Sequence, residues 1–223
     1  YFRSVAERLA PGGIACQWLP LYELGVEDVR TVVRSFSEGF PHVMIWLTYY
    51  DAVLVGARDP IVVDEAAVAR RLGVEPIRDD LAVVRMGTAE ELLSYFVMGT
   101  DGARAFGRGA SLNTDDTVRL EFSAPASQGA TGLDGRNVLA LAAHREGLLP
   151  YLVPAGPGPA RRDQVERWSR HLETGRVFDP VHARFLLGDR SSPEMQEALA
   201  RLEARDPGYA PLRFLLDEKG FWA

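Results

Sequence analysis

Cysteine is nearly absent from this chain of 223 residues, and Cys16 is its only example. A single cysteine excludes an internal disulfide and a zinc site built from several thiolates. Because Cys16 lies inside an apolar run, we expect it to be a small buried hydrophobic residue rather than a nucleophile.

Histidine is also scarce, and the four histidines are scattered along the chain. They form neither an HxxxH nor an HExxH pattern, so the sequence predicts no metal site. No serine stands in a Gly-x-Ser-x-Gly segment, which argues against a hydrolase of that type. The isolated pattern Gly107-Arg108-Gly109 is too short for a phosphate-binding loop.

Long hydrophobic runs and excess positive charge are missing as well. No apolar run approaches the roughly 20 residues that span a bilayer, and the amphipathic start of the chain does not resemble a signal peptide. A net charge of -6 argues against nucleic-acid binding. We therefore expect a cytoplasmic segment without nucleic-acid or membrane contact, and any tether to the inner membrane would come from upstream residues.

The first 60 residues show an alternation of helices and strands. Residues 1–10 have apolar side chains at helical spacing, and Pro11-Gly12-Gly13 ends that helix. The apolar run 14–19 predicts a strand that is covered on both faces. A second helix begins at Gly25, and it is followed by two further strands.

These two strands, 43–48 and 52–57, are joined by Tyr49-Tyr50-Asp51. So short a link cannot make a parallel crossover, so we expect the two strands to pair antiparallel. The sequence thus predicts an α/β fold with an antiparallel last strand.

Helices dominate the rest of the chain. Asp64 and Thr88 are the expected N-caps of helices that end near residues 72 and 98. The segment 112–122 predicts a polar turn that leads into a short alternating stretch. Residues 123–136 form a predicted linker rich in Ser, Ala, Gly and Pro, followed by amphipathic helices at about 137–149, 161–173, 180–187, 193–205 and 209–217.

Polar residues at turns are the candidates for chemistry. Gln17 ends the first strand, where ligands bind in open α/β sheets, although its amide could equally satisfy nearby backbone groups. Asp115 and Asp116 could attract a polyamine or a divalent ion, but Asn-Thr-Asp-Asp is also ordinary turn and cap chemistry. Tyr49 and Tyr50 could bind an amine or could simply stabilise the hairpin turn.

Several blocks of the sequence resemble the spermidine synthase-like family, the polyamine aminopropyltransferases. The resemblance is carried by Pro11-Gly12-Gly13-Ile14-Ala15-Cys16-Gln17-Trp18-Leu19-Pro20-Leu21-Tyr22, Phe40-Pro41-His42-Val43, Val53-Leu54-Val55-Gly56, Leu112-Asn113-Thr114-Asp115-Asp116 and Leu120-Glu121-Phe122. The last two blocks are typical of the larger bacterial members, some of which are fused to membrane segments.

The resemblance implies a Rossmann-like methyltransferase fold, of which residues 1–122 would be the C-terminal half. Residues 123–136 would be a linker, and residues 137–223 an α-helical tail that loosely resembles tetratricopeptide hairpins. Family members transfer an aminopropyl group from decarboxylated S-adenosylmethionine to a polyamine. Gln17 matches the family's Gln that faces the amine substrate, and either Tyr49 or Tyr50 matches a family Tyr, although the loop here is shorter than in the soluble synthases.

In that family, the glycine-rich loop, the acidic residue on the ribose and the catalytic Asp all precede the segment that matches residue 1. We therefore expect no catalytic residue here, no activity from this chain alone, and a homo-oligomer in the intact transferase. Two alternatives stay open: an S-adenosylmethionine-dependent methyltransferase of the same fold, and a non-catalytic, degenerate domain whose helical tail binds a partner. An exposed apolar groove on residues 137–217 would favour the last alternative.

Overall fold

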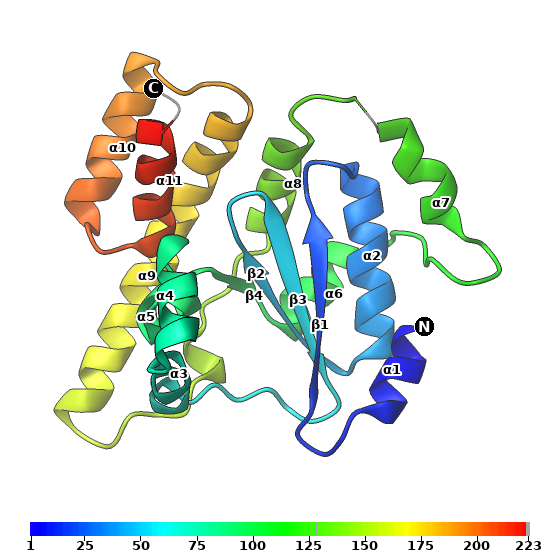
Figure 1. Ribbon diagram of the computed structural model, residues 1–223, viewed down its shortest axis with the longest axis horizontal. Helices are drawn as coiled ribbons and strands as arrows, with labels where there is room; N and C mark the ends of the chain where they lie inside the picture. The colour runs from blue at the N-terminus through cyan, green and yellow to red at the C-terminus, as the bar shows by residue number, and fades with distance from the viewer. Residues whose placement is uncertain (128, 222–223) are drawn as a thin grey trace.

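The protein has an α/β fold built on a four-stranded open sheet (Figure 1). The computed structural model describes residues 1–127 and 129–221, which form eleven α-helices, two 3-10 helices and four strands. The elements are α1 (Phe2–Arg8), β1 (Ile14–Pro20), α2 (Val26–Gly39), β2 (His42–Leu47), β3 (Asp51–Ala57), α3 (Glu65–Leu72), α4 (Glu75–Val83), α5 (Ala89–Ser94), β4 (Phe96–Met98), α6 (Thr100–Gly107), α7 (Arg119–Ser123), η1 (Ala124–Ser127), α8 (Leu133–Ala142), η2 (Leu149–Tyr151), α9 (Pro159–Leu186), α10 (Pro193–Arg205) and α11 (Ala210–Phe221).

The strand order is β1-β3-β2-β4, and every neighbouring pair is antiparallel. The register of β3 places Ala57 opposite both Ile14 of β1 and His42 of β2. The predicted antiparallel pairing of the two strands around Tyr49-Tyr50-Asp51 is therefore confirmed. Because β1 and β2 both oppose β3, they run parallel to each other with β3 between them.

One face of the sheet carries the main hydrophobic core. Helices α1, α2, α6 and α8 pack on this face (Figure 1) and bury apolar side chains of β1, β2 and β3 in one cluster. Gly56 is required here, because a Cβ at this position would lie 2.5 Å from the ring of Phe40 and 2.8 Å from that of Phe36. The sheet therefore approaches the α2 layer closely at its centre.

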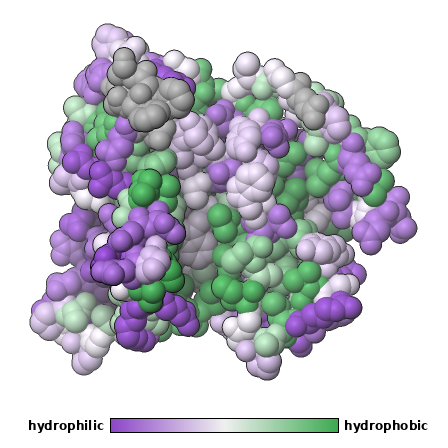
Figure 2. All heavy atoms as spheres, viewed as in Figure 1, coloured by the Kyte–Doolittle hydropathy of each residue, from purple (hydrophilic) through white to green (hydrophobic). Residues whose placement is uncertain are grey.

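The opposite face is only half covered. A second cluster around Met44, Phe96 and Trp168 packs over β2 and β4, but the β1 side stays open. Ile14 is 57% exposed and Trp18 is 55% exposed, and Cys16 between them is exposed too. Figure 2 shows hydrophobic side chains gathered on the open surface over β1 and β3.

The expectations of a doubly covered first strand and of a buried Cys16 are therefore wrong. The reason is tertiary, because the second cluster packs over β2 and β4 and does not extend to β1. An apolar run shows that a strand suits burial on both faces, but it does not show which other elements pack against those faces.

Three other segments differ locally from expectation. The short strand β4 replaces the end of the helix predicted to reach residue 98, although the Thr88 capping box that begins this helix is confirmed. The helix α7 takes the place of the predicted alternating stretch at residues 117–122. The helix α8 begins at Leu133, inside the segment 123–136 predicted as a linker.

In the helical tail, α9 runs without interruption through Pro180, where the sequence predicts two helices. Proline removes one helical hydrogen bond and usually bends or ends a helix. Here Phe178, Val181 and Phe185 are buried against α10 and α11, and this packing holds the helix together around the proline.

Candidate functional site

A groove of about 590 Å³ runs along the outer edge of β1. Its walls come from α1, from the C-terminal half of α2 and from the segment 112–120, three parts of the chain that the sequence does not place together. The polar and aromatic residues that line it include Gln17, Trp18, Ser35, Glu38, Asn113 and Asp115.

Gln17 lies half-buried in the middle of β1, opposite Leu54 of β3, so the prediction that it ends the strand is wrong. Its side chain is on the sheet face that α2 covers. Its Nε2 donates a hydrogen bond of 2.7 Å to the backbone carbonyl of Trp18. A carboxamide has two N–H donors and an acceptor oxygen, so after this one bond Gln17 can still donate a hydrogen bond to a ligand and accept one from it. Both roles considered for Gln17 from the sequence are thus compatible with its position.

Asp115 lines the same groove as Gln17, although 98 positions separate them in the sequence. The adjacent Asp116 is exposed and is not part of the groove wall. The two neighbouring carboxylates therefore have different surroundings, and only Asp115 shares a surface with Gln17.

Tyr49 and Tyr50 lie elsewhere, in the turn between β2 and β3. Tyr49 is 7% exposed, and its ring packs against His182 and Phe214 of the helical tail. Tyr50 is 38% exposed and meets the ring of Tyr22 edge-on. The groove therefore gathers Gln17 and Asp115 from the five predicted site residues, and leaves Tyr49, Tyr50 and Asp116 outside its wall.

A second polar cluster, the buried pair cluster, lies beside Tyr49 and consists of Arg145, Asp179 and His182. Arg145 and Asp179 form an ion pair of 2.5 Å, with side chains only 6% and 1% exposed. Arg145 also donates to the carbonyl of Phe96 on β4 at 2.7 Å. The adjoining cavity holds only about 10 Å³, so this cluster links the sheet to α9 and offers no space for a substrate.

The histidine of this cluster is held in its neutral form. His182 is 2% exposed and stacks on Phe178 at a ring separation of 5.3 Å. Burial lowers the pKa of His182 to about 4; the Tyr49 backbone opposes this shift, and the Arg145 cation reinforces it. A proton on His182 is therefore unfavourable as long as α9 covers the β2–β3 turn.

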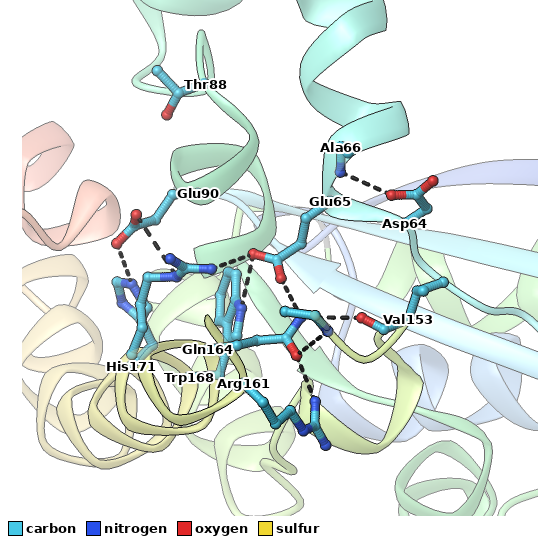
Figure 3. Close-up of polar contacts among 12 residues, drawn as sticks. Asp64, Glu65, Ala66, Thr88, Glu90, Val153, Arg161, Gln164, Trp168 and His171 are labelled. Atoms are coloured by element: carbon cyan, nitrogen blue, oxygen red, sulfur yellow. Dashed lines mark hydrogen bonds and ion pairs between the residues drawn. The ribbon is translucent and has the colours of Figure 1, made fainter. Parts of the chain in front are cut away.

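A third cluster joins α3 and α5 to α9 (Figure 3). Glu65 accepts hydrogen bonds from Arg167 at 2.6 Å and from Trp168 Nε1 at 3.1 Å. Glu90 lies 2.9 Å from Nε2 of His171, and this hydrogen bond lowers the pKa of Glu90. These polar groups form hydrogen bonds and ion pairs with one another, so the cluster joins α3 and α5 to α9.

Sequence reasoning missed both clusters on α9, and the sequence contains little that would have revealed them.

Among the described residues, no group of three or more His, Cys, Asp or Glu side chains is arranged to hold a metal ion. Within residues 1–127 and 129–221, no helix is both long enough and apolar enough to cross a membrane.

The groove along β1 thus offers space and exposed polar groups to a ligand. Two other surface grooves, of about 500 and 590 Å³, contain none of the five predicted site residues. The chain has no significant match among protein-family models, among curated protein sequences or among solved structures.

Proposed function

We propose that this chain supplies the amine-acceptor side of a spermidine synthase-like aminopropyltransferase, in which residues outside the chain bind the decarboxylated S-adenosylmethionine donor. The observation that carries the proposal is the groove along β1, which brings Gln17 and Asp115 to one surface. The acceptor would be a polyamine.

The charge of the groove suits an organic cation. The side chains on its wall include two carboxylates, those of Glu38 and Asp115, and one cation, that of Arg3. Gly39 brings the C-terminal end of α2 to the groove, and the carbonyl groups at such an end carry partial negative charge. A volume of about 590 Å³ is in the range of small-molecule sites.

The donor itself does not fit the residues of this chain. The sequence contains no Gly-x-Gly-x-x-Gly loop, whose backbone N–H groups would approach a nucleotide. We therefore assign only acceptor binding to these residues. Gln17 would hold the attacking amine without adding a charge that would disfavour its neutral form, and Asp115 would bind an ammonium group elsewhere on the acceptor.

The non-catalytic alternative required tail helices that expose a continuous apolar groove. Instead, Val138 and Leu141 of α8 and Ala183 of α9 are buried in the same cluster as the strands. These apolar side chains stabilise the α/β core, which favours the enzymatic proposal.

The proposal is tested by calorimetric titration of the 223-residue chain with 1,4-diaminobutane. Asp115→Asn should weaken binding about tenfold, because it removes a charge-assisted hydrogen bond, and Gln17→Ala about threefold, because it removes a neutral one. Asp116→Asn is the matched control, since it makes the same change in net charge outside the groove and should leave affinity within about twofold. Equal effects of the two Asp variants, or no binding by the unmodified chain at millimolar diamine, would refute the acceptor site.

A further inference from the structure

The loop that carries Asp115 is anchored to α2 by Asn113. The backbone N–H of Asn113 donates to Ser35 Oγ at 2.9 Å, although 78 positions separate the two residues. The side-chain Oδ1 of Asn113 accepts from the N–H of Leu120, also at 2.9 Å. Asn113 therefore connects the middle of α2 with the start of α7.

A second set of bonds closes the same loop around the two aspartates. The N–H of Thr117 donates to Thr114 Oγ1, and the N–H of Thr114 donates to Thr117 Oγ1, both at 3.2 Å. The two hydroxyl groups also lie 3.0 Å apart. The backbone at Asp115 is thus enclosed by a reciprocal pair of hydrogen bonds.

The loop also contains an unusual backbone conformation. Val118, which follows it, has φ +33° and ψ +38°, in the left-handed region that β-branched residues rarely adopt. Such a conformation persists only where the surrounding contacts impose it, and it is often found at functional sites. The bonds of Asn113 and of the threonine pair are contacts of this kind.

Ser35, which holds the loop, and the groove carboxylate Glu38 lie on one face of α2. Ser35 and Glu38 are three positions apart on the helix, so they lie on neighbouring turns of the same side, and both line the groove. The Ser35–Asn113 bond therefore fixes the loop of Asp115 relative to Glu38. It relates two carboxylates that belong to distant parts of the sequence.

We propose that Ser35 and Asn113 are positioning residues that set the separation between Glu38 and Asp115, and thereby select α,ω-diamines by the length of their carbon chain. The inference rests on the proposed function, because it assumes that the groove binds an amine. A diamine of matching length places one nitrogen near Asp115 and the other near Glu38 and Gln17, whereas a monoamine uses only one of the two carboxylates. Loosening the loop should therefore reduce the discrimination between lengths.

The test is calorimetry with unbranched α,ω-diamines of three to six carbons and with 1-aminobutane. The unmodified chain should prefer one length by about fivefold or more over its neighbours. Ser35→Ala should weaken that diamine about threefold to tenfold, flatten the length preference, and change 1-aminobutane by less than about twofold. Ser35→Thr keeps the hydroxyl and should restore the preference.

A double-mutant cycle separates positioning from general destabilisation. If Ser35 acts through Asp115, then Ser35→Ala should cause almost no further loss of affinity in an Asp115→Asn background. Thermal unfolding of each variant identifies any that fail to fold, in which case Asn113→Ala, which removes the acceptor for Leu120 N–H, takes the same place in the cycle.

The outcomes distinguish the two proposals. Amine binding that is insensitive to Asp115→Asn refutes the acceptor site and the inference built on it. Binding that depends on Asp115 but shows no length preference, or additive losses in the cycle, refutes the positioning role and leaves the acceptor site standing.

Discussion

The groove along β1 and the buried pair cluster on α9 are both polar, but they differ in what their polar groups contact. In the cluster, Arg145 and Asp179 are almost completely buried and bonded to each other. In the groove, Asp115 is exposed and Gln17 is half-buried, beside about 590 Å³ of open space. Polar groups that are already paired in a dry interior hold helices in place, whereas exposed ones remain able to bind a ligand. Charge content alone would not have separated the two regions.

The largest effect should follow from removing one partner of the buried ion pair, which tests whether this cluster stabilises the fold. Asp179→Ala would leave the Arg145 cation buried without its counter-ion, and we expect a loss of about 3–5 kcal/mol in the free energy of unfolding. Urea-induced unfolding measures it. Arg201→Ala, at an ion pair whose side chains are 69% and 67% exposed, is the matched control and should cost less than about 1 kcal/mol. A similar cost at both sites would contradict the structural role of the buried pair cluster.

The pH dependence of stability sharpens the same comparison. The pKa of His182 falls from 6.5 to about 4 on folding, so between these values the unfolded chain binds the proton more readily than the folded one. Stability should therefore be unaffected by His182 above pH 6.5, and should decrease by about 3 kcal/mol as the pH falls from 6.5 to 4. Unfolding in urea across this range measures the change.

His182→Phe keeps an aromatic ring against Phe178 and removes the titrating group. This variant should lose most of the dependence between pH 6.5 and 4, while the control His42→Phe, at the half-buried start of β2, should retain it. An unchanged pH profile in His182→Phe would show that other groups cause the acid sensitivity.

The smallest expected effect concerns the donor. S-adenosylmethionine and its decarboxylated form should produce no binding heat with the 223-residue chain, because the chain lacks a glycine-rich nucleotide loop. Calorimetry under the conditions of the diamine titration checks this, with the diamine as the positive control. Micromolar affinity for either sulfonium compound would place donor binding within these residues and contradict the assignment of the donor site to residues outside the chain.

Local signals predicted much of the secondary structure. Thr88 begins α5 with a complete capping box, and Asp64 caps α3 through two backbone N–H groups. Gly12, in the Pro-Gly-Gly turn, has φ +69°, a conformation that glycine adopts without strain. The short link at Tyr49-Tyr50-Asp51 indicated the antiparallel pairing of β2 with β3. Each of these features depends on residues within a few positions of one another.

The errors occurred where distant residues decide the outcome. The exposure of β1 depends on the second cluster covering β2 and β4 without reaching β1, and the continuity of α9 through Pro180 depends on packing against α10 and α11. The candidate site followed the same division. Gln17 and Asp115 were recognisable as polar residues, but their meeting in one groove and the Ser35–Asn113 bond that joins α2 to the loop of Asp115 were not.

The sequence by itself determined where several helices and strands begin, which two strands form a hairpin, and which side chains have the chemistry to bind an amine. These properties follow from hydrogen bonds and steric limits that act over a few residues. Only the tertiary structure decided which strand is an edge, which charges are paired in the interior, and which carboxylate lines the groove. Those outcomes depend on burial and on contacts between segments as far apart as Ser35 and Asn113, for which the chain carries no local signal.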